Sequence, residues 1–116
     1  MRDHTKLKAF QLADQLVLKV YIATKSFPSE EKFGLTAQMR SAALSIPSNI
    51  VEGCARNTEK DYLRFLDIAH GSARELEYQI SLALRLGFLN SKTGKVLEAK
   101  SIEVSKVING LINSLR

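Results

Sequence analysis

Apolar residues recur along this chain every three or four positions, and no segment alternates between apolar and polar residues as a strand does. Four segments carry this helical period, separated by "SFPSEE", by "RNTEKD" and by a break at Gly87. Proline stops a helix, Ser29 and Thr58 suit the N-cap position, and Gly87 suits a C-terminal cap. Ser91 is the N-cap expected for the last segment. The pattern therefore predicts four helices, of which the first covers about residues 3–26.

Four helices of similar length joined by short loops favour an all-α, antiparallel up-down-up-down bundle, with one domain over residues 1–116. The third segment is apolar beyond one stripe, because Leu63, Phe65, Ile68 and Leu82 fall outside its main apolar face. A helix that is apolar on more than one side lies centrally or faces another subunit. We therefore expect the chain to associate with copies of itself.

The stretch "SIPSNIVEG", residues 45–53, places a proline inside the second predicted helix. Pro47 has no backbone N–H and clashes with the preceding turn, so we expect a kink there. The apolar phase nevertheless continues across it, from Met39 and Ala42 to Ile46 and Ile50. This continuity favours one bent helix over two separate ones.

Polar residues form a second pattern on the same two central helices, which we call the polar seam. At about 100° per residue, side chains of the second helix fall on one narrow face, and the same spacing aligns a set on the third. The seam consists of Ser45, Asn49, Glu52, Gly53, Arg56, Arg64, Gly71, Ser72 and Glu75.

The seam is either a solvated side of each helix or a buried network in which Glu52 and Glu75 pair with Arg56 or Arg64 and Asn49 bridges them. Gly71 would let two helix backbones approach closely, because it has no side chain. The sequence leaves both interpretations of the seam open.

Several uncommon residues in a fixed order make the chain similar to a known family. The motifs are F-P-x-E-E-x-x-G-L, Q-x-R-x-A, S-I-P-S-N-I-x-E-G, F-L-x-I-A-x-G-S and E-L-E, within residues 27–89. They resemble the four helix bundle proteins of bacteria, also called 23S rRNA intervening-sequence proteins. His70 and Val51 stand where the family more often has arginine and alanine.

This resemblance implies an antiparallel four-helix bundle assembled as a homopentamer, with no established catalytic activity. It also implies a likeness to the accessory proteins of diversity-generating retroelements, which are basic pentamers that contact a reverse transcriptase and its RNA. The partners it implies are therefore further copies of the chain, RNA, or a ribonucleoprotein. "SIPSNIVEG" is then architectural, and sets helix packing and subunit register.

Composition and charge narrow the choice of partner. The formal net charge is +5, and residues 1–28 and 90–116 each contribute +3, whereas residues 29–57 sum to zero and residues 58–89 to −1. Because the first and last helices are neighbours in such a bundle, they would form one basic face. We expect nucleic acid, if bound, to contact Lys6, Lys8, Lys92, Lys95 and Lys106. General solubility is the competing explanation of this charge.

Two enzymatic or metal-dependent interpretations find weaker support. Carboxylate-bridged metal bundles need Glu-x-x-His on two helices, whereas this chain has only Asp67 three positions before His70, so we expect no metal and no cofactor. Arg64 and His70 form R-x-x-x-x-x-H, which is similar to the motif of HEPN ribonucleases, but Phe65 replaces the polar residue usual after the arginine. A metal-independent ribonuclease stays as the alternative to a non-enzymatic scaffold.

Cys54 is the only cysteine, and no segment approaches the ~20 apolar residues of a membrane span. A single thiol excludes an intrachain disulfide, and its expected role is that of a small buried side chain in a reducing compartment. The N-terminal "MRDHTKLKAF" lacks the apolar core of a signal peptide. We therefore expect a cytoplasmic protein.

Overall fold

The computed structural model describes residues 2–116, and four long α-helices account for most of them. They are α1 (Lys8–Thr24), α2 (Leu35–Cys54), α3 (Glu59–Arg85) and α4 (Ser91–Leu115). Two short 3-10 helices, η1 (His4–Lys6) and η2 (Ser29–Glu31), precede α1 and α2. Residues 2–116 contain no strand, and the predicted all-helical chain with four helices is confirmed.

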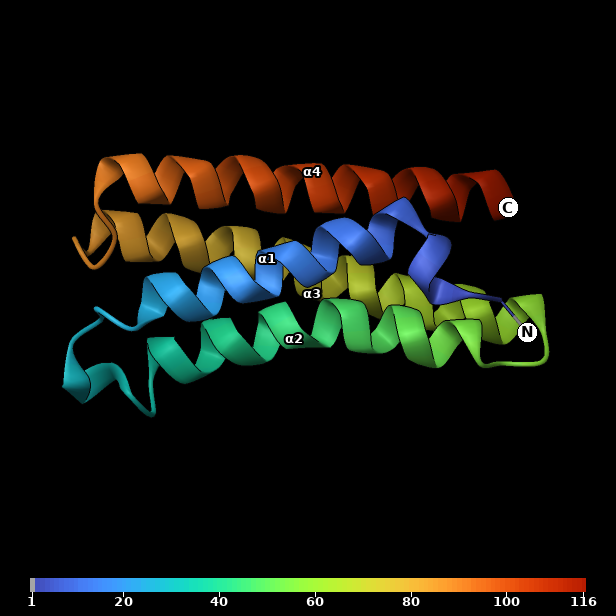
Figure 1. Cartoon of the computed structure of the whole chain (residues 1–116), viewed down its shortest axis with the longest axis horizontal. Helices are drawn as coiled ribbons and strands as arrows, with labels where there is room; N and C mark the ends of the chain where they lie inside the picture. Colours follow the sequence, from blue (N-terminus) through green and yellow to red (C-terminus); the bar gives the residue numbers. More distant parts are fainter. Residues whose placement is uncertain (1) are drawn as a thin grey trace.

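The four helices lie along the long axis of a body measuring 43 × 23 × 19 Å, and successive helices run in opposite directions (Figure 1). Each helix packs against the next in the chain, and α1 also packs against α4. α1 and α3 therefore lie diagonally across the bundle, as do α2 and α4. The first described residues and the C-terminus lie at the same end of the body (Figure 1).

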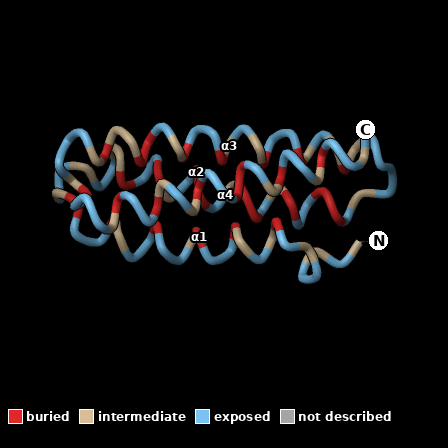
Figure 2. The backbone as a smooth tube through the Cα atoms, turned by 90° about the horizontal axis from the view of Figure 1, so that it is seen from above, coloured by how far each residue is buried: buried red, intermediate tan, exposed pale blue. Residues whose placement is uncertain are grey.

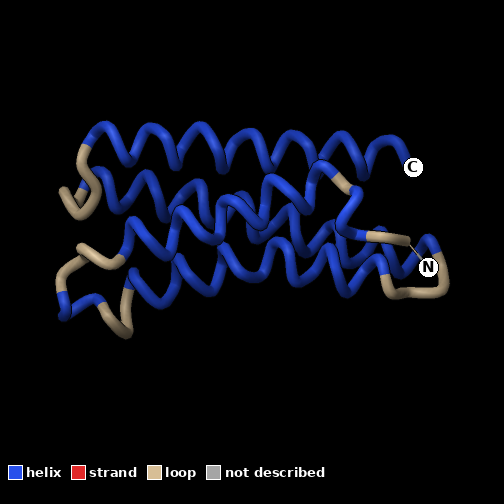
Figure 3. The backbone as a smooth tube through the Cα atoms, in the orientation of Figure 1, coloured by secondary structure: helices blue, strands red, loops and turns tan. Residues whose placement is uncertain are grey.

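Buried residues line the inner side of every helix and meet along the bundle axis (Figure 2). Their spacing of three and four residues follows the apolar pattern of the sequence, because side chains at these positions share one helix face. The largest fully buried side chains are Leu16, Val20, Met39, Ile46, Ile50, Tyr62, Leu66, Leu76, Ile80, Leu97, Val104 and Ile108. Short connections between the helices complete the chain (Figure 3).

Two of the predicted helix boundaries are confirmed. The Thr58 side chain accepts a hydrogen bond from the Asp61 backbone N–H, at 3.1 Å, and so caps α3. At the other end of α3, Gly87 adopts a positive φ of 78°, which glycine reaches without steric cost. Its N–H bonds to the Leu84 carbonyl and the Phe88 N–H to the Ala83 carbonyl, the bond pattern of a Schellman motif.

The predicted N-caps at Ser29 and Ser91 are wrong. Ser29 begins η2, and α2 starts only at Leu35, whose N–H donates to the Glu31 carboxylate at 3.0 Å. The carboxylate supplies the cap because it reaches the first free amide across the intervening turn. α4 is capped by Asn90, whose side chain accepts from the Thr93 N–H at 2.8 Å, so Ser91 is already helical.

Pro47 lies inside a single continuous helix, as the uninterrupted apolar phase predicted. Its ring is buried, and the proline nitrogen cannot donate to the carbonyl of Ala43 four residues earlier. The bend expected at this position stays a prediction.

Two glycines of α4 have opposite surroundings. A Cβ added at Gly94 would lie 2.0 Å from Cδ2 and 2.6 Å from Cγ of Leu84, because α3 and α4 approach closely there. A Cβ at Gly110 would have no atom within 4 Å. Only the first glycine is therefore required by packing within the chain.

We expect Gly94→Ala to lower the free energy of unfolding by about 1–3 kcal/mol, because Leu84 must leave its position. Gly110→Ala, the matched control, should raise it by about 0.5–1 kcal/mol, because alanine loses less entropy than glycine in a helix. Urea unfolding followed by circular dichroism measures both. Equal effects of the two substitutions would contradict the close approach at Gly94.

Candidate nucleic-acid interface and polar seam

The two helices with excess positive charge, α1 and α4, are neighbours in the bundle. Lys6, Lys8, Lys92, Lys95 and Lys106 all have exposed side chains, and none forms an ion pair within residues 2–116. The predicted basic residues are thus all available to a ligand.

The opposite directions of α1 and α4 separate these lysines into two groups. Lys8 lies 16 residues, about 24 Å, before the end of α1, and Lys106 lies 15 residues, about 22 Å, after the start of α4. These two, with Lys6, therefore belong to one part of the face. Lys92 and Lys95 belong to the other part, beside the last turns of α1.

Lys19 is a basic residue of this second part that the segment charges alone did not single out. It lines a groove between α1 and α4 together with Lys92. Lys19 lies in the same groove as Lys92 because the antiparallel arrangement brings the end of α1 next to the start of α4. An assumed antiparallel alignment of the two segments would have revealed it.

The polar seam follows the junction of α2 and α3. Ser45 Oγ and Ser72 Oγ share a hydrogen bond of 2.8 Å across this junction. The Asn49 side-chain amide donates to the Ser45 carbonyl at 2.8 Å and to Ser45 Oγ at 3.0 Å. These three side chains are half-buried and link the two helices with neutral hydrogen bonds. Asn49 does not bridge the carboxylates, as the buried network would have required.

The charged groups of the seam are largely exposed in the isolated chain, except Arg56 Nε, which is buried without a hydrogen-bond partner within residues 2–116. Arg56, just after the end of α2, forms an ion pair of 2.7 Å with Glu52 in its last turn. The two side chains remain 39% and 54% exposed. Arg64 pairs loosely with Asp61, at 4.0 Å, rather than with a seam carboxylate. Glu75 forms no ion pair within residues 2–116. Of the two interpretations left open, the solvated side describes these groups.

An aromatic ring accompanies the seam arginines. The guanidinium carbons of Arg56 and Arg64 lie 4.8 and 4.6 Å from the ring centroid of Phe65. Such contacts contribute about 0.5–1 kcal/mol each at exposed sites, so Phe65 offers both guanidinium groups a favourable contact near the start of α3.

The two seam glycines differ as well. A Cβ at Gly53 would lie 3.0 Å from Phe65 Cβ and 3.2 Å from Tyr62 Cδ1, so this glycine allows α2 to approach α3. Gly71 is exposed, and a Cβ at this position would have no atom within 4 Å. The close backbone approach expected at Gly71 does not occur within the chain.

Arg40, from the Q-x-R-x-A motif, joins α2 to the last turn of α1. Its Nε donates to Thr24 Oγ1 at 2.8 Å and its Nη2 to the Tyr21 carbonyl at 3.3 Å. The guanidinium also covers the Tyr21 ring, 4.8 Å from the centroid. The motif arginine therefore has a structural role at the end of α1.

The two residues of the ribonuclease alternative, Arg64 and His70, do not face each other on α3. Six residues separate Arg64 from His70, which places them about 9 Å apart along the axis and about 120° apart around it. Arg64 is exposed and pairs with Asp61, whereas His70 is half-buried on another side of the helix. One copy of the chain does not bring the two side chains to a common point.

Metal binding and thiol chemistry are the remaining kinds of site. Within residues 2–116, no three His, Cys, Asp or Glu side chains are grouped so that they could hold a metal ion. Cys54 is buried, as predicted, and burial raises the pKa of its thiol above the usual range. A protonated buried thiol is a poor nucleophile.

The seam and the basic face both lie in a region that matches a known family. The model of the family described as 23S rRNA-intervening sequence protein matches residues 5–110. The chain belongs to this family. The match covers all of α1, α2 and α3 and most of α4, so the seam and the basic face are both parts of the family domain.

A solved structure shares the fold of this intervening-sequence family member. It is a protein of unknown function from the S23 ribosomal protein family of Bacteroides thetaiotaomicron VPI-5482. The TM-score is 0.83 at 23% sequence identity, over 90% of this chain and 95% of the other. None of the curated proteins matches this sequence. Among residues 2–116, no helix has the length and apolar character needed to cross a membrane.

We expect Glu52→Ala to change the free energy of unfolding by no more than about 0.5 kcal/mol, because its ion pair is exposed and joins residues one helical turn apart. Ser72→Val provides a contrast, since it leaves the half-buried Ser45 hydroxyl without its 2.8 Å partner and should cost about 1 kcal/mol. Chemical denaturation of the two variants measures the difference. A destabilisation of about 3 kcal/mol or more by Glu52→Ala would show that the pair is buried in solution.

A second prediction concerns Tyr62, which is buried and covered by Arg2, with the guanidinium carbon 4.0 Å from the ring centroid. Burial raises the pKa of Tyr62 to about 12. The folded chain therefore keeps this proton to higher pH than the unfolded chain, whose tyrosine pKa is about 10. The contribution of the Tyr62 proton to the free energy of unfolding is complete below about pH 10. It is lost as the pH rises toward about 12, by up to about 1.4 kcal/mol per pH unit.

The measurement is the free energy of unfolding from about pH 8 to about pH 12 for the wild type and for Tyr62→Phe. The wild type should lose more stability above about pH 10 than the variant does. Parallel curves would contradict the raised pKa.

Proposed function

We propose that this chain is a non-enzymatic scaffold of the 23S rRNA intervening-sequence type, which assembles as a homopentamer and binds RNA through α1 and α4. The observation that carries the RNA proposal is the unpaired positive charge on two neighbouring helices. Five exposed lysines, Lys6, Lys8, Lys92, Lys95 and Lys106, have no acidic partner within residues 2–116. Phosphate groups are the ligands that such a surface attracts most strongly.

The expected form of RNA recognition follows from the aromatic residues of α1, none of which has a free exposed ring. Tyr21 is the aromatic residue of α1 with an exposed edge, and Arg40 covers its ring. Phe10 is half-buried with its ring edge against His4. Bases therefore find no free aromatic platform on α1, so recognition by backbone and shape fits better than sequence reading.

The family and the surface support assembly. Side chains such as Leu18, Ile22, Leu44, Ile68 and Tyr78 are large, apolar and exposed in the isolated chain. A small protein gains stability by covering such surface with another copy. The resemblance to retroelement accessory proteins adds a ribonucleoprotein as a context for the bound RNA. A cytoplasmic location, as expected from the sequence, would supply such a partner.

The test compares Lys8→Ala/Lys106→Ala with Lys60→Ala, a control that removes an exposed lysine from α3. RNA affinity is measured by fluorescence anisotropy at several salt concentrations. The double variant should bind more weakly, and the slope of log affinity against log salt should flatten by about 0.7–0.9 for each phosphate that is no longer neutralised. The control should keep the wild-type slope. Equal slopes for all three proteins would contradict the proposed interface.

The same RNA, incubated with the wild type and with His70→Ala in the presence of a chelator, tests for catalysis. We expect no cleavage by either protein. Cleavage by the wild type that disappears in His70→Ala would replace the scaffold with the ribonuclease.

A further inference from the structure

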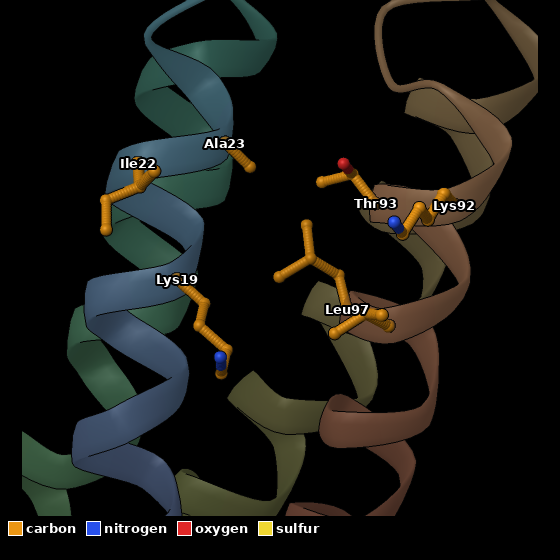
Figure 4. Close-up of a pocket in the computed structure, with 7 residues that line it drawn as sticks. Lys19, Ile22, Ala23, Lys92, Thr93 and Leu97 are labelled. Atoms are coloured by element: carbon orange, nitrogen blue, oxygen red, sulfur yellow. The ribbon is translucent and has the colours of Figure 1, made fainter.

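A groove between α1 and α4 combines an apolar floor with a basic rim. It encloses 430 Å³ and is lined by Lys19, Ile22, Ala23, Lys92, Thr93, Val96 and Leu97. Figure 4 shows the α1 and α4 side chains on its two sides, with a lysine contributed by each helix. Two adjoining hollows share Ile22 and extend the depression along α1 from Gln15 to Ser26.

The groove leaves a large apolar area in contact with solvent. Leu18, Ile22 and Val96 are 62%, 68% and 47% exposed. The three hollows have no aspartate or glutamate in their linings, so Lys19 and Lys92 are not neutralised there. The complementary ligand is an apolar helix face that carries a carboxylate.

The outer face of α3 carries apolar residues around one carboxylate, and Arg85 lies over the Tyr78 ring at its C-terminal end, with the guanidinium carbon 5.8 Å from the ring centroid. Ile68, Gly71, Glu75, Tyr78 and Leu82 follow one another at intervals of three and four residues, so they form one stripe, here called the α3 stripe. Ile68 and Tyr78 are 42% and 60% exposed, and Glu75 has no ion pair within residues 2–116. A Cβ at Gly71 would have no atom within 4 Å, so the helix backbone is open to a neighbour at this point.

The positions of the two surfaces allow one chain to use both at once. α3 lies diagonally opposite α1, so the α3 stripe and the groove face different directions. The stripe spans residues 68–82, about 21 Å of helix, and the groove follows α1 from Gln15 to Ser26, about 16 Å. The stripe is therefore long enough to cover the groove.

We infer that the α3 stripe of one copy docks in the α1–α4 groove of the next copy, with Glu75 beside Lys19 and Lys92. This contact deepens the proposed homo-oligomer and rests on it. It joins two different surfaces, so it is head-to-tail and can close into a ring. It also gives a role to Gly71, which packing within the chain does not require.

The contact divides the lysines of the basic face by role. Lys92 lines the groove and acts in assembly, although its exposure in a single chain suggested an RNA ligand. Lys95 and Lys106 line none of the three hollows and stay available for RNA.

Charge reversal tests the contact. Lys19→Glu/Lys92→Glu places carboxylates opposite Glu75, and Glu75→Lys places an ammonium opposite two lysines. Each should weaken self-association at least about 10-fold, measured by sedimentation and by light scattering against the 12.9 kDa mass of one chain. The combined triple variant reverses both sides and should recover the wild-type assembly. Glu30→Lys, on exposed η2, is the control for the charge change of Glu75→Lys and should assemble normally.

Gly71→Trp separates assembly from folding. Gly71 is exposed and a Cβ there would have no atom within 4 Å, so we expect the circular dichroism spectrum and the unfolding midpoint of a dilute monomer to be kept. The indole would prevent the α3 stripe from entering the groove, so the variant should be monomeric at concentrations where the wild type is assembled.

The outcomes distinguish the contact from the proposed assembly. A monomeric wild type at micromolar concentration would overturn the homo-oligomer itself. An assembled wild type whose mass persists in Glu75→Lys and Gly71→Trp would overturn this contact and leave the assembly standing. Dissociation of the single-sided variants without recovery in the triple variant would also overturn it, because the groove would then take an occupant other than the α3 stripe, such as a different face of the chain or an acidic helix of another protein.

Discussion

The close packing of α2 against α3 is the constraint on which the rest of the structure depends. Gly53 brings the two backbones together, because any Cβ at this position would press on Phe65 and Tyr62. The pair buries Ile46 and Ile50 with Leu66 and forms the most extensive helix contact of the bundle. α1 packs against α2, α4 packs against α3, and α1 and α4 contact each other to close the bundle.

The packing of α2 against α3 also determines which polar groups of the seam are hydrogen-bonded and which are exposed. Ser45, Asn49 and Ser72 lie near enough to the junction to bond with one another, and their neutral hydrogen bonds need no compensating charge. The charged members lie farther out, where water solvates them and an ion pair adds little stability. A helix junction of this kind tolerates polar residues at its rim because most of their polar groups are paired or hydrated, and Arg56 Nε is the buried exception within the seam.

Charge and exposed apolar surface are distributed unevenly over the sides of the molecule. Positive charge accumulates on α1 and α4, where acidic residues are few, and an unpaired carboxylate, that of Glu75, remains on the outer face of α3 within residues 2–116. In the proposed assembly, Glu75 of one copy meets the groove lysines of the next, and the lysines outside that contact remain for RNA. The proposal therefore gives the excess positive charge a role in both assembly and RNA binding.

The sequence by itself determined the four helices, the core face of each, the cap at Thr58, the turn at Gly87 and the buried thiol of Cys54, because periodicity and capping are local properties of the chain. It could not decide whether Glu52 and Arg56 are buried, since helix phase places a side chain on a face but does not show how deeply the neighbouring helix covers it. It misplaced the caps at Ser29 and Ser91, where Glu31 and Asn90 reach the free amides through loop geometry that no residue pattern specifies. Only the tertiary structure brought Lys19 beside Lys92 and left Gly71 open, because these relations depend on how helices distant in sequence are aligned against one another.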